Sequence, residues 1–347
     1  MSLAAKIHAS RKAAKADADE QRAKEAFNNH RHIAKVIIKA KKTKDTAFPS
    51  NEIETLTEIA YKVVAKNFER YPTLPGLTDK TVLTEIVKLT NRNLPITTIA
   101  RNVDNEFYWE EKCAELKNIK KEQHGNSYKQ AYIETHIQKL LEAHKSEGSL
   151  DEVKKELEAA RYEVFTLVIT QLQHFNIEFV FKYLPNLTNL TLTYGAKHIG
   201  MEYERPLFGM KMSDANFFKN CLRTTTSLTY LSLPGNLIDD DLISILIKGL
   251  MLNKTISQID LSHNKIGHSG ARKISKYLLQ SQILTHLNLA DNQINYEGSR
   301  YLCQALKVNT SLKVLNLKLN RLDDKALLLP VQRCASTSES RTPASRS

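Results

Sequence analysis

LTYLSLPGNLI (residues 228–238) is the first of four segments that align without a gap in this 347-residue chain. ISQIDLSHNKI (256–266), LTHLNLADNQI (284–294) and LKVLNLKLNRL (312–322) follow, and each begins 28 residues after the previous one. Every copy has apolar residues at positions one, four, six and eleven and asparagine at position nine. A fixed period of this length predicts a stack of similar units that share one core.

Each unit is predicted to be a strand, a turn and a helix. Apolar residues at positions four and six alternate as a short strand requires. Downstream, Leu242, Leu246 and Leu250 are spaced as one stripe of a helix, and the same positions recur in the next two copies. We therefore expect an α/β solenoid of 28-residue strand-turn-helix units with a parallel sheet on its concave side.

The position-nine asparagines are predicted to have a structural role. A buried amide side chain can pair with the backbone groups that lose their partners where the chain leaves the strand. We call these residues the asparagine ladder: Asn236, Asn264, Asn292 and Asn320.

The outward-facing strand positions form the candidate protein-binding surface. They are polar and nearly neutral, with no paired carboxylates and no nucleophile beside a base. No phosphate-binding loop, zinc-protease helix or nucleophile elbow occurs in the sequence. We expect a non-enzymatic protein with no catalytic residue, no cofactor and no metal site. The candidate contacts on this concave face are Tyr230, Gln258, Asp260, His286, Asn288 and Asn316.

An earlier copy, LTNLTLTYG from Leu187, has Gly195 at the asparagine position and is followed by an insert at 194–213. Two interpretations of the insert stay open: an adaptable partner contact, which exposed methionine and aromatic side chains favour, or a loop that folds back on the first repeat. The candidate contacts are Met201, Tyr203, Phe208 and Met210.

The N-terminal half is predicted to be helical. NEIETLTEIAYKVVAKNFERY (51–71) opens with a capping pair, Asn51 and Glu54. One apolar face is predicted to carry Ile53, Leu56, Ile59 or Ala60, Val63 and Val64. Trp109 is expected to anchor the core. A further helix containing Val153, Leu157, Val164 and Phe165 would lead into the repeats and cover their first edge. The expected domains are a basic helical arm (1–45), an all-α domain (46–148), a helical lead-in and cap (149–186), the repeats (187–326) and a disordered tail (327–347).

The net charge of +12 is unevenly placed. Residues 1–45 carry twelve Lys/Arg and five Asp/Glu, and the tail from 327 carries +2, which leaves only +3 for the rest. An acidic partner is therefore expected to meet the arm, and nucleic acid is not expected because few aromatics and no binding motif accompany these charges. The four scattered cysteines and the lack of a signal peptide or membrane span favour the reducing cytoplasm, with no membrane partner.

Several stretches together resemble one known family. LPNLTNLTLTYGAKHIGMEYERPLF (184–208) and LSLPGNLIDDDL (231–242) resemble the ribonuclease-inhibitor-type leucine-rich repeats of the nexin-dynein regulatory complex subunit 5 family, the T-complex-associated testis-expressed proteins. LPITTIARNVDNEFYWEEKC (94–113) and HGNSYKQAYIETHIQKLLE (124–142) are similar to that family's N-terminal region. The resemblance implies a structural subunit of the axonemal link between doublet microtubules in the cytoskeleton of cilia and flagella, where it would restrain dynein-driven sliding. The implied partners are the other subunits of the complex, and the arm could meet acidic tubulin on the doublet microtubule.

Two other classes stay open. The Leu-Pro start and later Trp of residues 94–113 also look a little like an F-box, which would make the protein a substrate adaptor of a ubiquitin ligase. A GTPase-activating or inhibitor-like repeat protein is least favoured, since such proteins commonly present strongly acidic surfaces.

The repeat pattern fails after residue 326. Pro330 occupies the helical position of Leu246, Ile274 and Leu302, where proline would cost about 3 kcal/mol. We expect native repeat sequence to end near Ala326, and the tail to reflect alternative splicing or a faulty gene model.

Overall fold

The computed structural model describes residues 55–70, 79–91, 94–114, 116, 119–144, 150–174, 176–195 and 207–322. The chain divides into two compact units, residues 1–132 and 133–347. The division falls inside helix α6 (Tyr128–Ala143), whereas the sequence placed the end of the helical domain at 148. The predictions for the arm, for Met201 and Tyr203, and for Pro330 and the tail lie outside the described residues.

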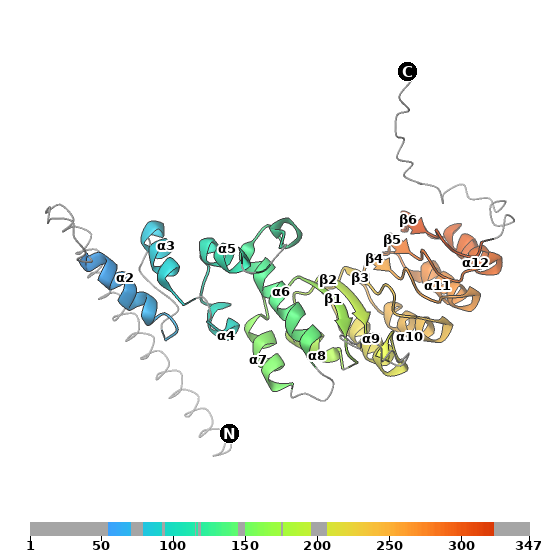
Figure 1. Ribbon diagram of the computed structural model, residues 1–347. Coiled ribbons are helices and arrows are strands. Elements are labelled where there is room, and N and C mark those ends of the chain that lie inside the picture. The colour runs from blue at the N-terminus through green and yellow to red at the C-terminus, as the bar shows by residue number, and fades with distance from the viewer. Residues whose placement is uncertain are drawn as a thin grey trace, which may run out of the picture. The chain divides into compact units, whose positions relative to one another are not determined.

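The first unit is built from short helices (Figure 1). They are α2 (Leu56–Lys66), α3 (Lys80–Leu89), α4 (Ile96–Ile99), α5 (Glu106–Ala114), a 3-10 turn η1 (Lys121–Gln123) and the start of α6. Trp109 is fully buried, its Nε1 donates to the Val103 carbonyl at 2.9 Å, and its ring meets Tyr108 edge to face at 5.4 Å. The predicted role of Trp109 as a core anchor is confirmed.

Helix α2 differs from the sequence prediction in both its start and its buried face. Thr55 caps it, and the side chains of Thr55 and Glu58 form the reciprocal capping box, whereas the predicted pair Asn51 and Glu54 lies outside the described residues. The predicted stripe is only partly correct: Leu56, Ile59 and Val63 are exposed, by 59%, 45% and 55%, whereas Val64 is buried as predicted. The face that packs with α3 is lined by Val64 and Ala65, and Ala60, the predicted alternative to Ile59, packs against this cluster.

The second unit contains a six-stranded parallel sheet in the order β1-β2-β3-β4-β5-β6. The leucine or isoleucine at position four of each repeat pairs with its counterpart in the next, so the repeats stack in register. The prediction of an α/β repeat solenoid is confirmed. Its strands are β1 (Thr166–Leu172), β2 (Asn189–Tyr194), β3 (Tyr230–Ser232), β4 (Gln258–Asp260), β5 (His286–Asn288) and β6 (Val314–Asn316).

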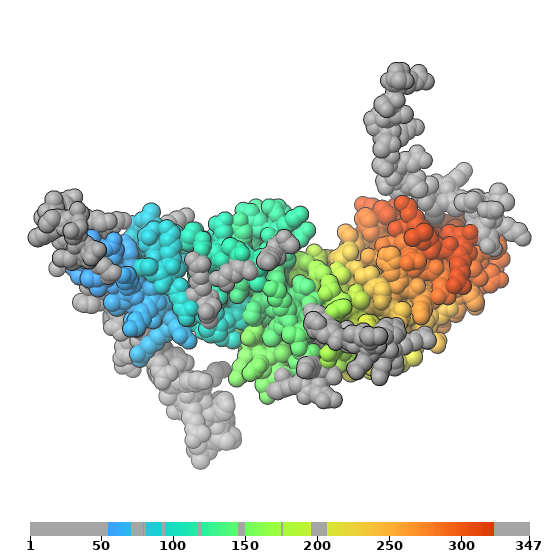
Figure 2. Space-filling view, in the orientation of Figure 1, coloured from blue at the N-terminus to red at the C-terminus, as the bar shows by residue number. Residues whose placement is uncertain are grey.

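The helices of the repeats lie side by side along one face of this sheet (Figure 1). Small residues bring them close: a Cβ added at Gly249 would lie 2.7 Å from the Lys219 carbonyl oxygen, inside contact distance. The space-filling view shows the repeats from yellow to red as one continuous body (Figure 2). The helices are α8 (Glu178–Tyr183), α9 (Met212–Thr224), α10 (Asp240–Leu250), α11 (His268–Gln280) and α12 (Tyr296–Leu306).

Strand β1 was not predicted from the sequence. The expected lead-in helix ends early, as α7 (Asp151–Ala159), and Phe165 directly precedes the strand TLVITQL. The free edge of β1 is covered by α6, because Glu134 Oε1 accepts from the backbone N–H groups of Phe165 and Thr166 at 2.8 and 2.7 Å. Glu142 accepts from the backbone N–H of Thr170 at 2.8 Å. These carboxylates place the second half of α6 in the repeat unit and supply the acceptors that an edge strand lacks.

Candidate functional site

The asparagine ladder is fully engaged inside the repeat unit. Asn264 Nδ2 donates to the carbonyls of Leu233 and Leu261, both at 2.9 Å, and its Oδ1 accepts from the backbone N–H of Ile238 at 3.0 Å. Asn292 repeats this set one unit further, from Leu261 to Ile266. Each amide thus joins two successive turns.

The two ends of the asparagine ladder keep the same geometry. Asn320 Nδ2 donates to Leu289 at 2.8 Å and Oδ1 accepts from Ile294. Asn236 Nδ2 donates to Leu192 and Oδ1 accepts from Tyr194, both at 2.7 Å. With these bonds made, the amides connect neighbouring repeats.

A second set of amides, which sequence reasoning missed, lies where α10 and α12 return to the next strand. Asn253 Nδ2 donates to the Leu222 carbonyl at 2.8 Å, and its Oδ1 accepts from Ile256 N–H at 2.8 Å. Asn309 makes the equivalent bonds two repeats later, to Leu278 and Leu312. The recurrence of asparagine at a multiple of the repeat period was the signal that could have found them.

The first column of the concave face is the more available of its two columns. Tyr230, Gln258 and His286 follow one another in register on β3, β4 and β5. Gln258 is exposed, and Tyr230 and His286 are half-buried. The His286 Nδ1 lies 2.8 Å from Thr285 Oγ1. These side chains form a polar strip that can contact another protein.

In the second column, side-chain oxygens accept hydrogen bonds from the chain's own backbone. Oδ1 of Asp260 accepts from the backbone N–H of Ser262 at 2.9 Å, and Asn288 and Asn316 do the same two residues ahead at 3.1 Å. This Asx turn ends the strand and starts the loop. The three residues lie together on the face as the sequence predicted, but each has one oxygen committed to the turn.

Position eight of each repeat has a left-handed backbone. Its φ is +65° at Gly235, +57° at His263, +52° at Asp291 and +56° at Leu319. Glycine and aspartate tolerate this conformation better than histidine or leucine. The position also brings His263 Nδ1 within 2.8 Å of Asp291 Oδ2 across neighbouring repeats, where both side chains are exposed.

The end of the insert folds back on the first repeat. The backbone N–H of Gly209 donates to Tyr194 at 3.2 Å, and that of Met210 donates to Asn236 at 2.8 Å. Met210 is only 5% exposed, so its prediction as a partner contact is corrected: burial against the repeat removes it from the surface. Phe208 is half-buried, close to Gly195.

A buried polar cluster lies between the ends of β1 and β2 and the start of α9. His174 Nδ1 is 2.7 Å from Asp214 Oδ2, which also accepts from the Lys211 backbone N–H. The His174 ring stacks on Tyr194 with centroids 5.4 Å apart. Burial raises the pKa of Tyr194 well above its usual value, so the phenol stays neutral. The cluster fixes α9 against the first two strands.

Reactive thiol chemistry is disfavoured at the two buried cysteines. Burial, with Glu106 and Glu110 nearby, raises the pKa of Cys113 to about 11, and burial raises that of Cys221 to about 12. Both thiols are therefore protonated at neutral pH and lack the thiolate that nucleophiles need. Within the described ranges, no cluster of three or more His, Cys, Asp or Glu side chains could hold a metal ion, and no helix is long and apolar enough to span a membrane.

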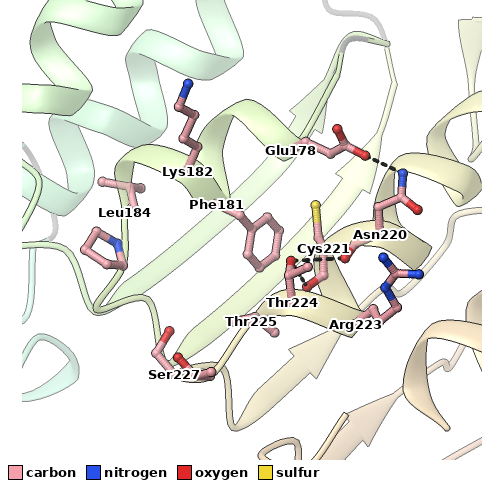
Figure 3. A pocket seen from close by; sticks show the side chains of 12 residues that line it. Glu178, Phe181, Lys182, Leu184, Asn220, Cys221, Arg223, Thr224, Thr225 and Ser227 are labelled. Carbon is pink, nitrogen blue, oxygen red and sulfur yellow. Dashed lines mark hydrogen bonds between the residues drawn. The ribbon is translucent and has the colours of Figure 1, made fainter. Parts of the chain in front are cut away.

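A hollow of about 630 Å³ lies between α8 and α9 (Figure 3). Phe181 and Cys221 form part of its wall, and Glu178 accepts from Asn220 Nδ2 at 2.6 Å across its rim. Arg223 and the hydroxyls of Thr224 and nearby residues line the rest. No acid-base or nucleophilic arrangement accompanies this hollow, which is a groove between neighbouring helices.

Comparison with known proteins agrees with the repeat architecture. The family model for the Leucine Rich repeat matches residues 252–275, 280–303 and 308–328. Actin-Binding Site 2 of Leiomodin-1 is a structural neighbour with 22% identity and a TM-score of 0.32, covering 38% of this chain and 71% of that one. The second unit of the chain is therefore a leucine-rich repeat structure, on the basis of the family match and the observed strand and helix order.

Curated relatives carry one common name. Dynein regulatory complex subunit 5 of Chlamydomonas reinhardtii is 38% identical over 195 residues, which is 55% of this chain and 50% of that protein. Dynein regulatory complex subunit 5 of Mus musculus is 28% identical over 259 residues, covering 65% of this chain and 51% of the relative. The chain spans about half the length of the curated relatives it matches.

Proposed function

Because this chain is similar to dynein regulatory complex subunit 5 over more than half of its own length, we propose that it is a non-enzymatic structural subunit of the nexin-dynein regulatory complex. In this role it acts as a protein-binding scaffold in the link between doublet microtubules of the ciliary or flagellar axoneme. The link regulates dynein-driven motility. The observation that carries the proposal is the sequence similarity, and the repeat surface supports it because its polar side chains suit protein contacts.

The concave face is the proposed contact for other subunits of the complex. Tyr230, Gln258 and His286 present side chains on three successive strands, and the second column adds the atoms that its Asx turns leave free. Such a strip can bind one partner across several repeats, as the binding surfaces of solenoid proteins commonly do. Met201, Tyr203 and Phe208 of the insert stay proposed contacts in addition to this face.

A tagged full-length chain expressed in a ciliated cell tests the assignment. The protein is expected in the detergent-resistant axoneme, co-purifying with other subunits of the complex. Absence from cilia would contradict the proposal, and capture of a Skp-type adaptor would favour the ubiquitin-ligase alternative, which no relative supports.

A pair of matched variants tests the concave face. Gln258→Ala with His286→Ala is expected to reduce co-purification of the other subunits without lowering thermal stability, because both side chains lie on the surface. Gln282→Ala with Thr310→Ala changes two surface side chains in the helix-to-strand turns and serves as control. If both variants captured equal amounts of the other subunits, the concave face would not be their contact.

The basic arm is a second proposed contact, with the acidic surface of tubulin on the doublet microtubule. Residues 1–45 carry an excess of seven positive charges. Deleting them should weaken co-sedimentation with microtubules and reduce its dependence on salt, because screening acts on exposed charges. Unchanged co-sedimentation after the deletion would refute this contact.

A further inference from the structure

Charged residues are sorted by sign along helices α10, α11 and α12. Asp240 and Asp241 lie in the first turn of α10, Glu297 lies in the first turn of α12, and α11 contains no acidic residue. Acids at helix N-termini are explained by the helix dipole. Beyond the first turns, every charged residue of these three helices is lysine or arginine.

These cations share one outward surface. Arg272 and Lys276 are four residues apart on α11, Arg300 lies one repeat after Arg272, and Lys248 lies one repeat before Lys276. Lys307 follows the end of α12 on the same side, and all five are exposed. We call Lys248, Arg272, Lys276, Arg300 and Lys307 the helical basic face.

The helical basic face has no counter-charge of its own. Across the described residues, none of its five side chains has a carboxylate within ion-pair distance, although His263 and Asp291 in the turns after β4 and β5 do pair. Like charges four residues apart, as at Arg272 and Lys276, destabilise a helix slightly. Because this arrangement does not stabilise the fold, it indicates that these side chains bind another molecule.

Two of the guanidiniums are held in place by an aromatic ring. Arg272 lies 5.5 Å and Arg300 5.8 Å from the centre of the Tyr301 ring, so one half-buried tyrosine on α12 orders arginines from two helices. Ordering the side chains before binding reduces the entropy lost on association. The ring is also occupied by these contacts, which removes it as a stacking platform for a nucleic acid base.

Exposed apolar residues adjoin the cations at the C-terminal ends of the same helices. Met251 and Leu252 follow α10, Leu279 ends α11, and Val308 follows α12; all are between 39% and 67% exposed. Their recurrence at nearly the same place in three repeats makes a band rather than single exposed side chains.

We propose that the helical basic face and this apolar band bind an acidic polypeptide segment that carries apolar side chains among its carboxylates. Packed helices lie about 10 Å apart, and an extended chain rises about 3.4 Å per residue. In an extended peptide that crosses the helices, every third residue therefore lies over the next helix. The contact goes beyond the proposed scaffold function and is independent of the arm and of the concave face.

A fluorescent peptide of roughly four Glu-Glu-Leu repeats is a suitable probe, since its period matches this spacing. Binding to the full chain is measured by anisotropy. Arg272→Gln, Lys276→Gln and Arg300→Gln together should weaken binding roughly tenfold, because exposed ion pairs are individually weak. Glutamine keeps the helix propensity, so circular dichroism should show the variant folded.

The matched control removes three exposed positive charges that flank the strand β6: Lys313→Gln, Lys318→Gln and Arg321→Gln. Its affinity should stay within about twofold of the parent. Carbodiimide cross-linking of peptide carboxylates should label Lys248, Lys276 and Lys307.

Three outcomes would overturn the proposal. They are equal weakening by the two triple variants, cross-links confined to residues 1–45, and tighter binding of an oligonucleotide or of phosphatidylserine vesicles with the same dependence on Arg272, Lys276 and Arg300. None of these would change where the protein localises in a ciliated cell, so failure here and failure of the proposed function are distinguishable.

Discussion

The interior repeats and the last repeat share one sequence pattern but bury it differently. At position eleven, Ile238, Ile266 and Ile294 are fully buried, whereas Leu322 is 38% exposed. At position one, Leu284 is fully buried and its counterpart Leu312 is half-buried. Each unit contributes only one side of the core between neighbours, so an identical residue gains less where no described repeat follows.

The first strand, β1, lies at the other end of the sheet, and its edge is completed in another way. The edge of β1 is satisfied by the side chains of Glu134 and Glu142 on α6, which replace the carbonyls of a preceding strand. The two ends of one sheet therefore differ in what completes them, although the strands themselves are alike. The expected stability effects below follow from that difference.

The largest expected effect comes from cavity formation at position eleven. Ile266→Ala should destabilise the protein by about 4 kcal/mol, whereas Leu322→Ala should cost about 1 kcal/mol, because the transfer and cavity costs scale with burial. Urea unfolding followed by circular dichroism measures both. Equal losses would show that the last repeat is packed as fully as the interior ones.

The asparagine ladder should give the next largest effect. Asn264→Ala removes the bonds from Nδ2 to the carbonyls of Leu233, Leu261 and Ser262 and leaves the buried Ile238 N–H without an acceptor, for a loss of about 3 kcal/mol. Asn320→Ala is expected to cost roughly half as much, because its site is reached by water. Hydrogen exchange at Ile238 and Ile294 locates the loss; faster exchange across the whole sheet in both variants would contradict a local role.

Removing the cover of β1 should cost about 2 kcal/mol. Glu134→Ala leaves the N–H groups of Phe165 and Thr166 without their acceptor, and Glu134→Gln should restore part of the stability by keeping an oxygen in place. Thermal unfolding compares the two variants. If they lose the same stability, the carboxylate oxygen is not what satisfies this edge.

The smallest effect is a gain at position eight. Leu319→Gly should raise stability by up to about 1 kcal/mol, because glycine relieves the left-handed backbone and removes an exposed apolar side chain. Asp291→Gly is the matched change one repeat earlier, where the native residue already tolerates the conformation and pairs with His263. A loss of stability at Leu319→Gly would mean that the leucine has a packing role.

Periodicity was sufficient to predict the strands β3 to β6 and the helices α10, α11 and α12 of the described repeats. It failed where a local pattern was compatible with two structures. TLVITQL was absorbed into a helix although its β-branched residues favour a strand, and only its pairing with β2 made it one. On α2, Leu56, Ile59 and Val63 were assigned to the same buried face as Val64, but α3 packs only against the side that carries Val64 and Ala65.

The candidate contacts divide in the same way. Tyr230, Gln258 and His286 could be placed on one surface from the strand period alone. The burial of Met210 and the turn-forming bonds of Asp260 could not be predicted, since both depend on groups that other parts of the chain bring to them. The helical basic face was not predicted, because its five cations come from three helices. These cations form one surface only when the helices stack.

By itself the sequence determined the repeat length, the parallel α/β architecture and the asparagine ladder, because each follows from a short-range period that recurs in every unit. The tertiary structure alone decided which apolar residues are buried, how the first edge is covered by Glu134 and Glu142, and where cations gather. Burial and counter-charges are properties of neighbours in space, and a residue's own position in the sequence does not specify those neighbours.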